Sequence, residues 1–134
     1  MLEITLRAGT IQALIQPLYE MPLVGKASRV RTRILQDMEA TLDEVRELAR
    51  GIQEKNGTSQ DDKGELIGDN IDETAKEINE LSDDKYPVSE PIVGGFKELH
   101  EALESVMVVS NWALAYDELM TALEAVIETK EEEV

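Results

Sequence analysis

The feature that most constrains this chain is an apolar repeat with a spacing of three or four residues between positions 26 and 54. Such spacings place side chains on one face of an α-helix, because the helix turns once in about 3.6 residues. No proline interrupts the repeat, which contains Ala27, Val30, Ile34, Met38, Thr41, Val45, Leu48 and Ile52. The sequence therefore predicts one helix over residues 26–54, far longer than the average of about 11–12 residues.

Shorter elements are predicted before this helix. Apolar and polar residues alternate over residues 2–7, which predicts a short, half-buried strand. The pair Gly9-Thr10 then predicts a turn and a helix N-cap. The helix that follows, over residues 11–19, should kink or stop early because Pro17 removes a backbone donor.

The remainder of the chain predicts a loop, an extended segment and three helices. Glycines and mixed charges over residues 55–69 indicate a flexible internal loop. Asn70 should cap the next helix, whose buried face would hold Ile71, Ala75, Ile78 and Leu81. Prolines in KYPVSEPIV (residues 85–93) favour an extended edge strand near residues 2–7. Two further helices are expected. One follows Gly94-Gly95, and its apolar side holds Phe96, Leu99, Leu103 and Val106. The other is capped by Ser110, and its apolar side holds Trp112, Ala115, Leu119, Leu123, Val126 and Ile127.

These elements predict a mainly α (α+β) fold in which four or five helices pack on one long helix, with one or two short strands. We expect residues 1–134 to form a single domain, with an acidic frayed tail at residues 129–134. Aromatic residues make up only 4% of the chain, so the core must be built mostly from aliphatic side chains.

Composition argues against several classes of function. The chain has no cysteine and a single histidine, His100, so disulfides and thiolate metal sites are excluded and no catalytic arrangement can be argued. We therefore predict no enzyme activity, no metal and no cofactor. No apolar run approaches the ~20 residues that span a bilayer, and the N-terminus does not resemble a secretory signal, so a reducing cytosolic setting is expected.

Charge is distributed unevenly. Residues 1–50 hold seven cations and seven acids, so the entire net charge of -16 lies in residues 51–134. Such a surface repels nucleic acid and anionic lipid and attracts a protein partner with a basic surface. The proposed partner-binding acids are Asp72, Glu73, Glu77, Glu80, Asp83 and Asp84. Carboxylates spread over helices in this way can imitate a phosphate backbone, although plain solvation of the surface remains an alternative.

A basic cluster contrasts with this acidity at the start of the long helix. Lys26, Arg29 and Arg33 share one face, whereas Arg31 lies at the edge of the apolar stripe. Cations in the first turns of a helix oppose the helix dipole, so an acidic segment folded over them would stabilise the arrangement. The cluster can therefore serve internal pairing or contact a partner.

The block MPLVGKASRVRTRILQDMEATLDEVRELARG resembles a family of small proteins from phages and prophages of Gram-positive bacteria. That family is classed as a domain of unknown function. The resemblance covers about the first 55 residues and is carried by Leu23, Gly25, Lys26, Ala27, Ser28, Arg29, Arg31 and Arg33. It implies phage origin and a fold, but no mechanism.

Together, these features suggest a phage-encoded, non-enzymatic binding protein in the host cytoplasm. It would use its acidic surface to occupy a cationic nucleic-acid-binding site on a host or defence protein, as a DNA-mimic inhibitor such as an anti-CRISPR protein does. The alternative is a tail or virion-assembly accessory protein, which could act as a homo-oligomer.

Overall fold

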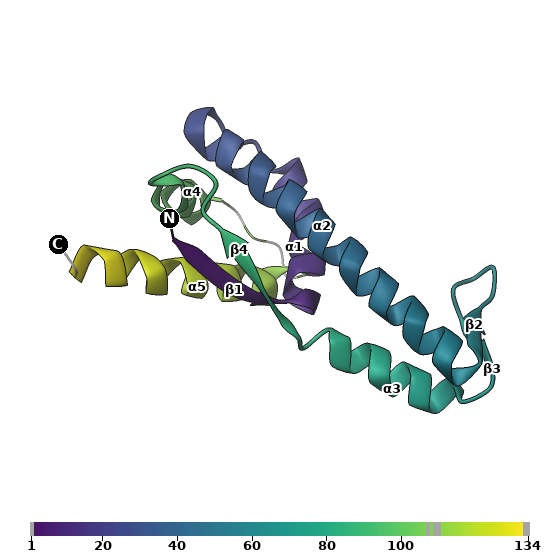
Figure 1. The fold of residues 1–134 in the computed structure, drawn as a ribbon. Coiled ribbons are helices and arrows are strands. Elements are labelled where there is room, and N and C mark those ends of the chain that lie inside the picture. The colour runs from purple at the N-terminus through teal and green to yellow at the C-terminus, as the bar shows by residue number, and fades with distance from the viewer. Residues whose placement is uncertain (1, 107, 109–110, 133–134) are drawn as a thin grey trace.

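The computed structural model describes residues 2–106, 108 and 111–132, with side chains as far as Glu128. This part of the chain forms five helices and two separate two-stranded antiparallel sheets (Figure 1), which confirms the mainly α (α+β) class. In chain order the elements are β1 (Glu3–Arg7), α1 (Ala8–Glu20), α2 (Gly25–Asn56), β2 (Thr58–Gln60), β3 (Leu66–Gly68), α3 (Ile71–Leu81), β4 (Lys85–Ser89), α4 (Gly95–Glu104) and α5 (Ala113–Glu132).

The long helix α2 is confirmed and spans 32 residues, about 48 Å at 1.5 Å per residue. It ends where Gly57 adopts a left-handed conformation (φ 74°) and its N–H bonds back to the last turn. Its apolar face is buried only as far as Leu42. The sequence predicts that the whole apolar stripe is buried, but Leu48 is 51% exposed. The reason is that this half of α2 projects beyond the body of the molecule (Figure 1).

The predicted turn at Gly9-Thr10 is wrong, because β1 leads directly into α1. The first free N–H groups of α1 are satisfied by the segment after α3: Ala8 N–H donates to the Asp84 carbonyl at 2.9 Å and Gly9 N–H to the Ser82 carbonyl at 3.0 Å. The early stop at Pro17 is also wrong. The helix continues to Glu20 with Pro17 inside its last turn, so the loss of one backbone donor does not end it.

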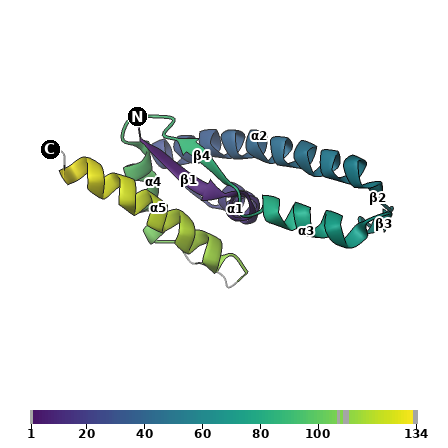
Figure 2. The ribbon, with the colours of Figure 1, turned by 60° about the horizontal axis from the view of Figure 1, so that its bottom comes forward.

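The strand expected near residues 2–7 is β4, which pairs antiparallel with β1 and sets Ile4 opposite Val88. Both of these side chains are buried. Pro87 is tolerated because this sheet has only two strands, so each strand has a free edge. β4 contacts α2 and β1 contacts α5, so the small sheet lies within the body between helices (Figure 2).

Helices α4 and α5 complete the body. α4 begins against α2, where a Cβ added to Gly95 would lie 2.8 Å from Val30 Cγ2. α5 packs on β1, α1 and α4 rather than on the long helix. The backbone is helical as far as Glu132, within the segment 129–134 for which a frayed tail is predicted. Residues 133–134 and the proposed cap Ser110 lie outside the described residues.

The segment expected to be an irregular loop over residues 55–69 contains the hairpin β2–β3 instead, which adds two strands to the number predicted. Its turn is organised by Asp61, whose Oδ1 accepts hydrogen bonds from the N–H groups of Lys63 and Glu65, both at 2.9 Å. Gly68 is required here because its φ is +102° and a Cβ would meet the Gly57 carbonyl oxygen at 2.7 Å.

The Asn70 cap is also wrong. Asn70 is left-handed (φ 53°), and its amide donates to the Asn56 carbonyl at 2.8 Å instead of accepting from α3. The only fully buried residue described in α3 is Thr74, whereas Ile71, expected in the core, is 39% exposed. α3 packs on one side of α2 and on the hairpin strand β3, and Ile71 at its start remains partly open to solvent.

One of the many carboxylates after residue 50 is internal. Glu90 is 1% exposed, and its Oε2 accepts from the Phe96 N–H at 3.1 Å. Glu90 therefore caps the N-terminus of α4, where a helix favours negative charge. Its second oxygen, Oε1, has no hydrogen-bond partner among the described residues.

Candidate functional site

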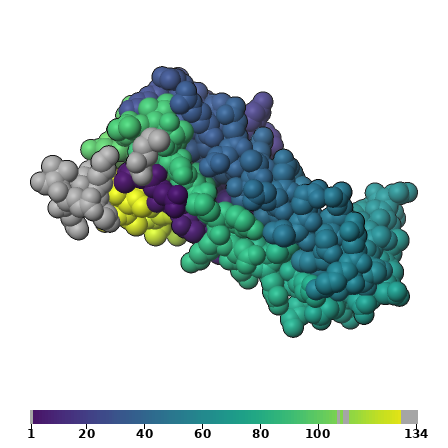
Figure 3. Space-filling model, in the orientation of Figure 1, coloured from purple at the N-terminus to yellow at the C-terminus, as the bar shows by residue number. Residues whose placement is uncertain are grey.

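The acidic residues singled out by the sequence lie largely on one projection. The last turn of α2, the β2–β3 hairpin and α3 extend away from the body (Figures 1 and 3). We call residues 54–84 the acidic arm. These residues carry eleven acids and three cations, a net charge of -8. Half of the net charge of the protein is therefore carried by 31 consecutive residues.

Buried polar contacts hold the acidic arm in shape. The Thr58 hydroxyl lies 2.7 Å from the Thr74 hydroxyl and donates to the Asp69 carbonyl at 2.5 Å. The Asn56 amide donates to the same Thr74 hydroxyl at 3.0 Å. These contacts join the end of α2, the hairpin and α3, so the arm has a defined surface despite its small apolar core.

Two of the six predicted partner-binding acids are already paired within the chain. The Lys55 ammonium donates to Glu77 at 3.1 Å, and this hydrogen bond holds the pKa of the Glu77 carboxyl below its usual value. The Glu77 side chain is mostly covered, with 22% of its surface exposed. Asp83 forms an exposed pair with Arg7 at 3.3 Å.

The other four predicted acids are available to a partner. Asp72, Glu73, Glu80 and Asp84 are exposed, and none forms an ion pair with any residue that the structure describes. The three that belong to α3 lie on an 11-residue helix with two acids in its first turn, where the helix dipole stabilises negative charge.

The basic cluster is not covered by the acidic half in the described part of the chain. Lys26 donates to the Val93 carbonyl at 3.0 Å, just before α4. Arg29 and Arg33 are exposed and make no ion pair within residues 2–106, 108 and 111–128. Internal pairing is therefore not the arrangement seen here, and the two arginines remain free for a partner.

Arg31 has a separate role. Its Nη1 donates to the carbonyl oxygens of Leu18 and Met21, at 2.8 and 2.7 Å, and its Nη2 donates to Ser28 Oγ at 3.2 Å. These carbonyls belong to the C-terminal end of α1, where an arginine satisfies free acceptors and complements the helix dipole. Arg31, which the sequence places at the edge of the apolar stripe, thus has a structural role and joins α1 to α2.

A second polar cluster joins both ends of the chain. Glu118 on α5 accepts hydrogen bonds from the Thr10 hydroxyl and from Arg7 Nη2. The Thr10 hydrogen bond, supported by the Arg7 guanidinium, holds the pKa of the Glu118 carboxyl below its usual value, although partial burial opposes this effect. Thr10, expected at a helix cap, therefore anchors α5 to the N-terminal segment.

This lowered pKa gives Glu118 a pH-dependent contribution to stability. We expect Glu118→Gln to lower the free energy of unfolding by about 1 kcal/mol at pH 7, a value kept small by solvent access to the carboxylate. The carboxyl pKa in the unfolded chain is about 4.3, and the contribution is complete at pH values above it. The contribution is lost as the pH falls through the lower pKa that Glu118 has in the folded protein. Urea unfolding of both proteins at pH 7 and pH 3 should show the difference closing in acid. Asp117→Asn, an exposed neighbour, is the control, and a difference independent of pH would contradict this role.

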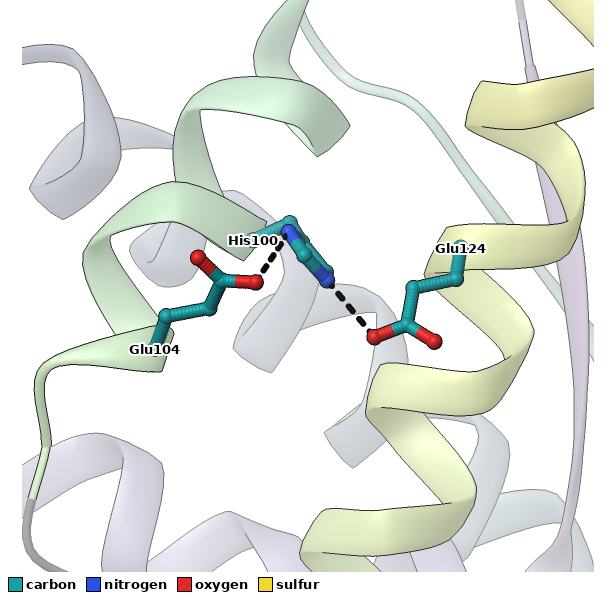
Figure 4. Close-up of side chains that lie close together, drawn as sticks. All are labelled: His100, Glu104 and Glu124. Atoms are coloured by element: carbon teal, nitrogen blue, oxygen red, sulfur yellow. Dashed lines mark hydrogen bonds and ion pairs between the residues drawn. The ribbon is translucent and has the colours of Figure 1, made fainter.

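The structure also assembles a site that the sequence did not predict. His100 on α4 lies between two carboxylates (Figure 4): its Nε2 is 3.0 Å from Glu124 Oε1 on α5, and its Nδ1 is 3.7 Å from Glu104 Oε1, one turn along α4. His100 is 15% exposed, whereas Glu104 and Glu124 are 60% and 50% exposed. Only the i, i+4 spacing of His100 and Glu104 is visible in the sequence, because Glu124 joins them through the packing of α5 on α4.

Comparison with protein-family models, curated proteins and solved structures found no significant match to this chain. None of the helices in the described part of the chain is long and apolar enough to cross a membrane.

Proposed function

We propose that this protein is a non-enzymatic binding protein whose acidic arm occupies a cationic, nucleic-acid-binding site on another protein. The observation that carries the proposal is the net charge of -8 on one projection, together with the exposed carboxylates of Asp72, Glu73, Glu80 and Asp84, which form no ion pair with the described residues. A charged projection reaches into a basic groove more easily than a flat surface does, and its field accelerates the encounter.

The physical basis is imitation of a phosphate backbone. Carboxylates three or four residues apart on a helix lie about 5–6 Å from each other, so an arm of this kind presents closely spaced negative charges on a rigid support. A nucleic-acid-binding groove gains much of its affinity from such charges without reading bases. The polar contacts around Thr74 favour this role, because a preformed arm loses less entropy on binding.

The resemblance of the first 55 residues to phage proteins supports a setting in the host cytoplasm during infection. A defence nuclease that holds nucleic acid in a basic channel, such as a CRISPR effector, is then the kind of target that fits the charge. Arg29 and Arg33, which lie on the body and have no ion pair in the described structure, could contact an acidic rim of the same partner.

A second candidate is an accessory protein of tail or virion assembly. The observation that favours it is the exposure of apolar side chains along the projecting half of α2 and the acidic arm: Leu48, Ile67 and Ile71 are 51%, 45% and 39% exposed. Side chains of this kind become buried when copies of a chain, or another virion component, associate.

The test is a tagged pull-down from host lysate followed by a binding titration with the retained protein. The arm variant replaces Asp72, Glu73, Glu80 and Asp84 with the corresponding amides, and the matched control makes the same change in charge at the exposed residues Asp37, Glu39, Glu98 and Glu101. We expect the arm variant to bind at least about tenfold more weakly than the control, because a contact with several charges loses much of its electrostatic attraction.

Salt and competitor separate the two candidates. Affinity should fall steeply between about 50 and 300 mM salt, over which the Debye length shrinks from roughly 14 to 6 Å. The nucleic acid of the target should also displace the protein. Binding that ignores salt, leaves nucleic acid in place and treats the arm and control variants alike would contradict mimicry and favour an apolar assembly interface.

A further inference from the structure

His100 lies between two carboxylates that face different nitrogens of its ring. Both ring nitrogens face carboxylate oxygens, at 3.0 Å toward Glu124 and 3.7 Å toward Glu104 (Figure 4). A neutral imidazole carries a hydrogen on only one nitrogen, so the other nitrogen directs a lone pair at a negative oxygen. A metal ion bound at the nitrogen without a hydrogen would take that lone pair as one ligand and the neighbouring carboxylate oxygen as another.

We propose that His100, Glu104 and Glu124 form a binding site for a divalent transition metal, with Zn²⁺ the best match. One ligand atom from each residue can be chosen so that all three lie within 4.8 Å of one another. Imidazole nitrogen combined with carboxylate oxygen suits zinc, which commonly takes three protein ligands and a water. Calcium and magnesium prefer sites made of oxygen alone.

Accepting the ion requires Glu104 or Glu124 to turn, because the two carboxylates face different nitrogens of the ring. Zinc bonds to nitrogen and oxygen at about 2.0–2.2 Å, which sets the ligand atoms of a tetrahedral site roughly 3.3–3.5 Å apart. The contact between His100 Nε2 and Glu124 Oε1 is already close to this spacing. Glu104 and Glu124 are 60% and 50% exposed, so their side chains can turn toward the ion without disturbing the core.

The partly covered position of His100 gives the site its fixed point. The ring is 15% exposed, and the adjacent residue Leu99 and the residue three positions later, Leu103, are both buried in the core. α4 therefore holds the imidazole in place while the two carboxylates approach from the solvent side. Because Glu124 belongs to α5, a bound ion would connect α5 to α4. The Tyr116 hydroxyl on α5 already donates a hydrogen bond to the Leu103 carbonyl of α4 at 2.8 Å.

The experiment adds Zn²⁺ alone to the chelator-treated full chain, with Mg²⁺ as the comparison ion. We expect one equivalent of zinc to bind and the melting temperature to rise by roughly 5–15 °C at a hundredfold excess over Kd. His100 is the only histidine, so its imidazole NMR signals report directly on the site and should shift with zinc but not with magnesium.

Variants distinguish this site from the general attraction of an acidic surface for cations. His100→Gln and Glu124→Gln should each weaken zinc binding by about tenfold or more. Glu101→Gln removes one charge from the exposed face of the same helix and should leave zinc binding unchanged. Glu124→Gln also serves if His100→Gln fails to fold.

Two results would overturn the proposal. Zinc binding that is equally strong in the His100→Gln and Glu124→Gln variants would place the ion elsewhere on the acidic surface. Imidazole signals that do not shift when zinc is added would show that His100 is not a ligand of the ion.

Discussion

Replacing Phe96 by alanine is expected to lower the free energy of unfolding by about 3–5 kcal/mol, the usual cost of a large cavity in a core. Phe96 is the only phenylalanine in the chain and is fully buried. It follows Gly95, where α4 approaches α2 so closely that a Cβ would lie 2.8 Å from Val30 Cγ2. The backbone around the cavity is therefore too tightly placed to collapse into it.

Urea unfolding followed by circular dichroism measures this effect. Val93→Ala is the control, because Val93 lies just before α4 but is 67% exposed, and its truncation should change stability by less than about 0.5 kcal/mol. A loss at Phe96 no greater than that at Val93 would mean that α4 does not pack on α2 as described.

Arg31→Met is expected to cost about 2–3 kcal/mol, because it removes three hydrogen bonds from a charged donor and leaves the Leu18 and Met21 carbonyls with only their backbone N–H donors. Arg31→Lys should recover only part of this loss, since an ammonium on a flexible stem does not reproduce the fixed fork of donors.

Arg33→Met is the matched control for Arg31. It removes the same charge from the same helix, but Arg33 is exposed and has no ion pair in the described part of the chain, so its effect should stay within about 0.5 kcal/mol. Equal losses at the two positions would show that the cations of α2 act together as a charge cluster and that Arg31 has no separate structural role.

If both results hold, the cations at the start of α2 divide into two groups. Arg31 then has a structural role, because it donates hydrogen bonds to carbonyls at the end of α1. Lys26 likewise donates to the Val93 carbonyl just before α4. Arg29 and Arg33 remain as the cations that a partner could contact. This division concerns the body of the molecule and is independent of the proposed role of the acidic arm.

The long helix could be predicted from the sequence because helical periodicity is a local property. The repeat over residues 26–54 matches α2 within two residues at each end, and the alternation over residues 2–7 predicts β1. The extended segment around Pro87 was predicted for a similar local reason, since proline disfavours both a helix and a central strand.

Burial was predicted less well, because it depends on what packs against each face. Leu48 and Ile71 follow the apolar pattern yet stay exposed, since α2 extends past the body and α3 packs mainly on α2. Glu90 is the opposite case: its type suggests a surface residue, but the start of α4 requires a buried acceptor there. Neither outcome is encoded in the spacing of residues along one element.

The sequence by itself determined the helical class, the long helix and the concentration of negative charge after residue 50. Only the tertiary structure decided which charges are free and which side chains meet. Glu77 is paired with Lys55, Asp83 with Arg7, and His100 with Glu124, a residue 24 positions away. The physical reason is that periodicity records the face of one helix, whereas an ion pair or a ligand set depends on how two elements pack.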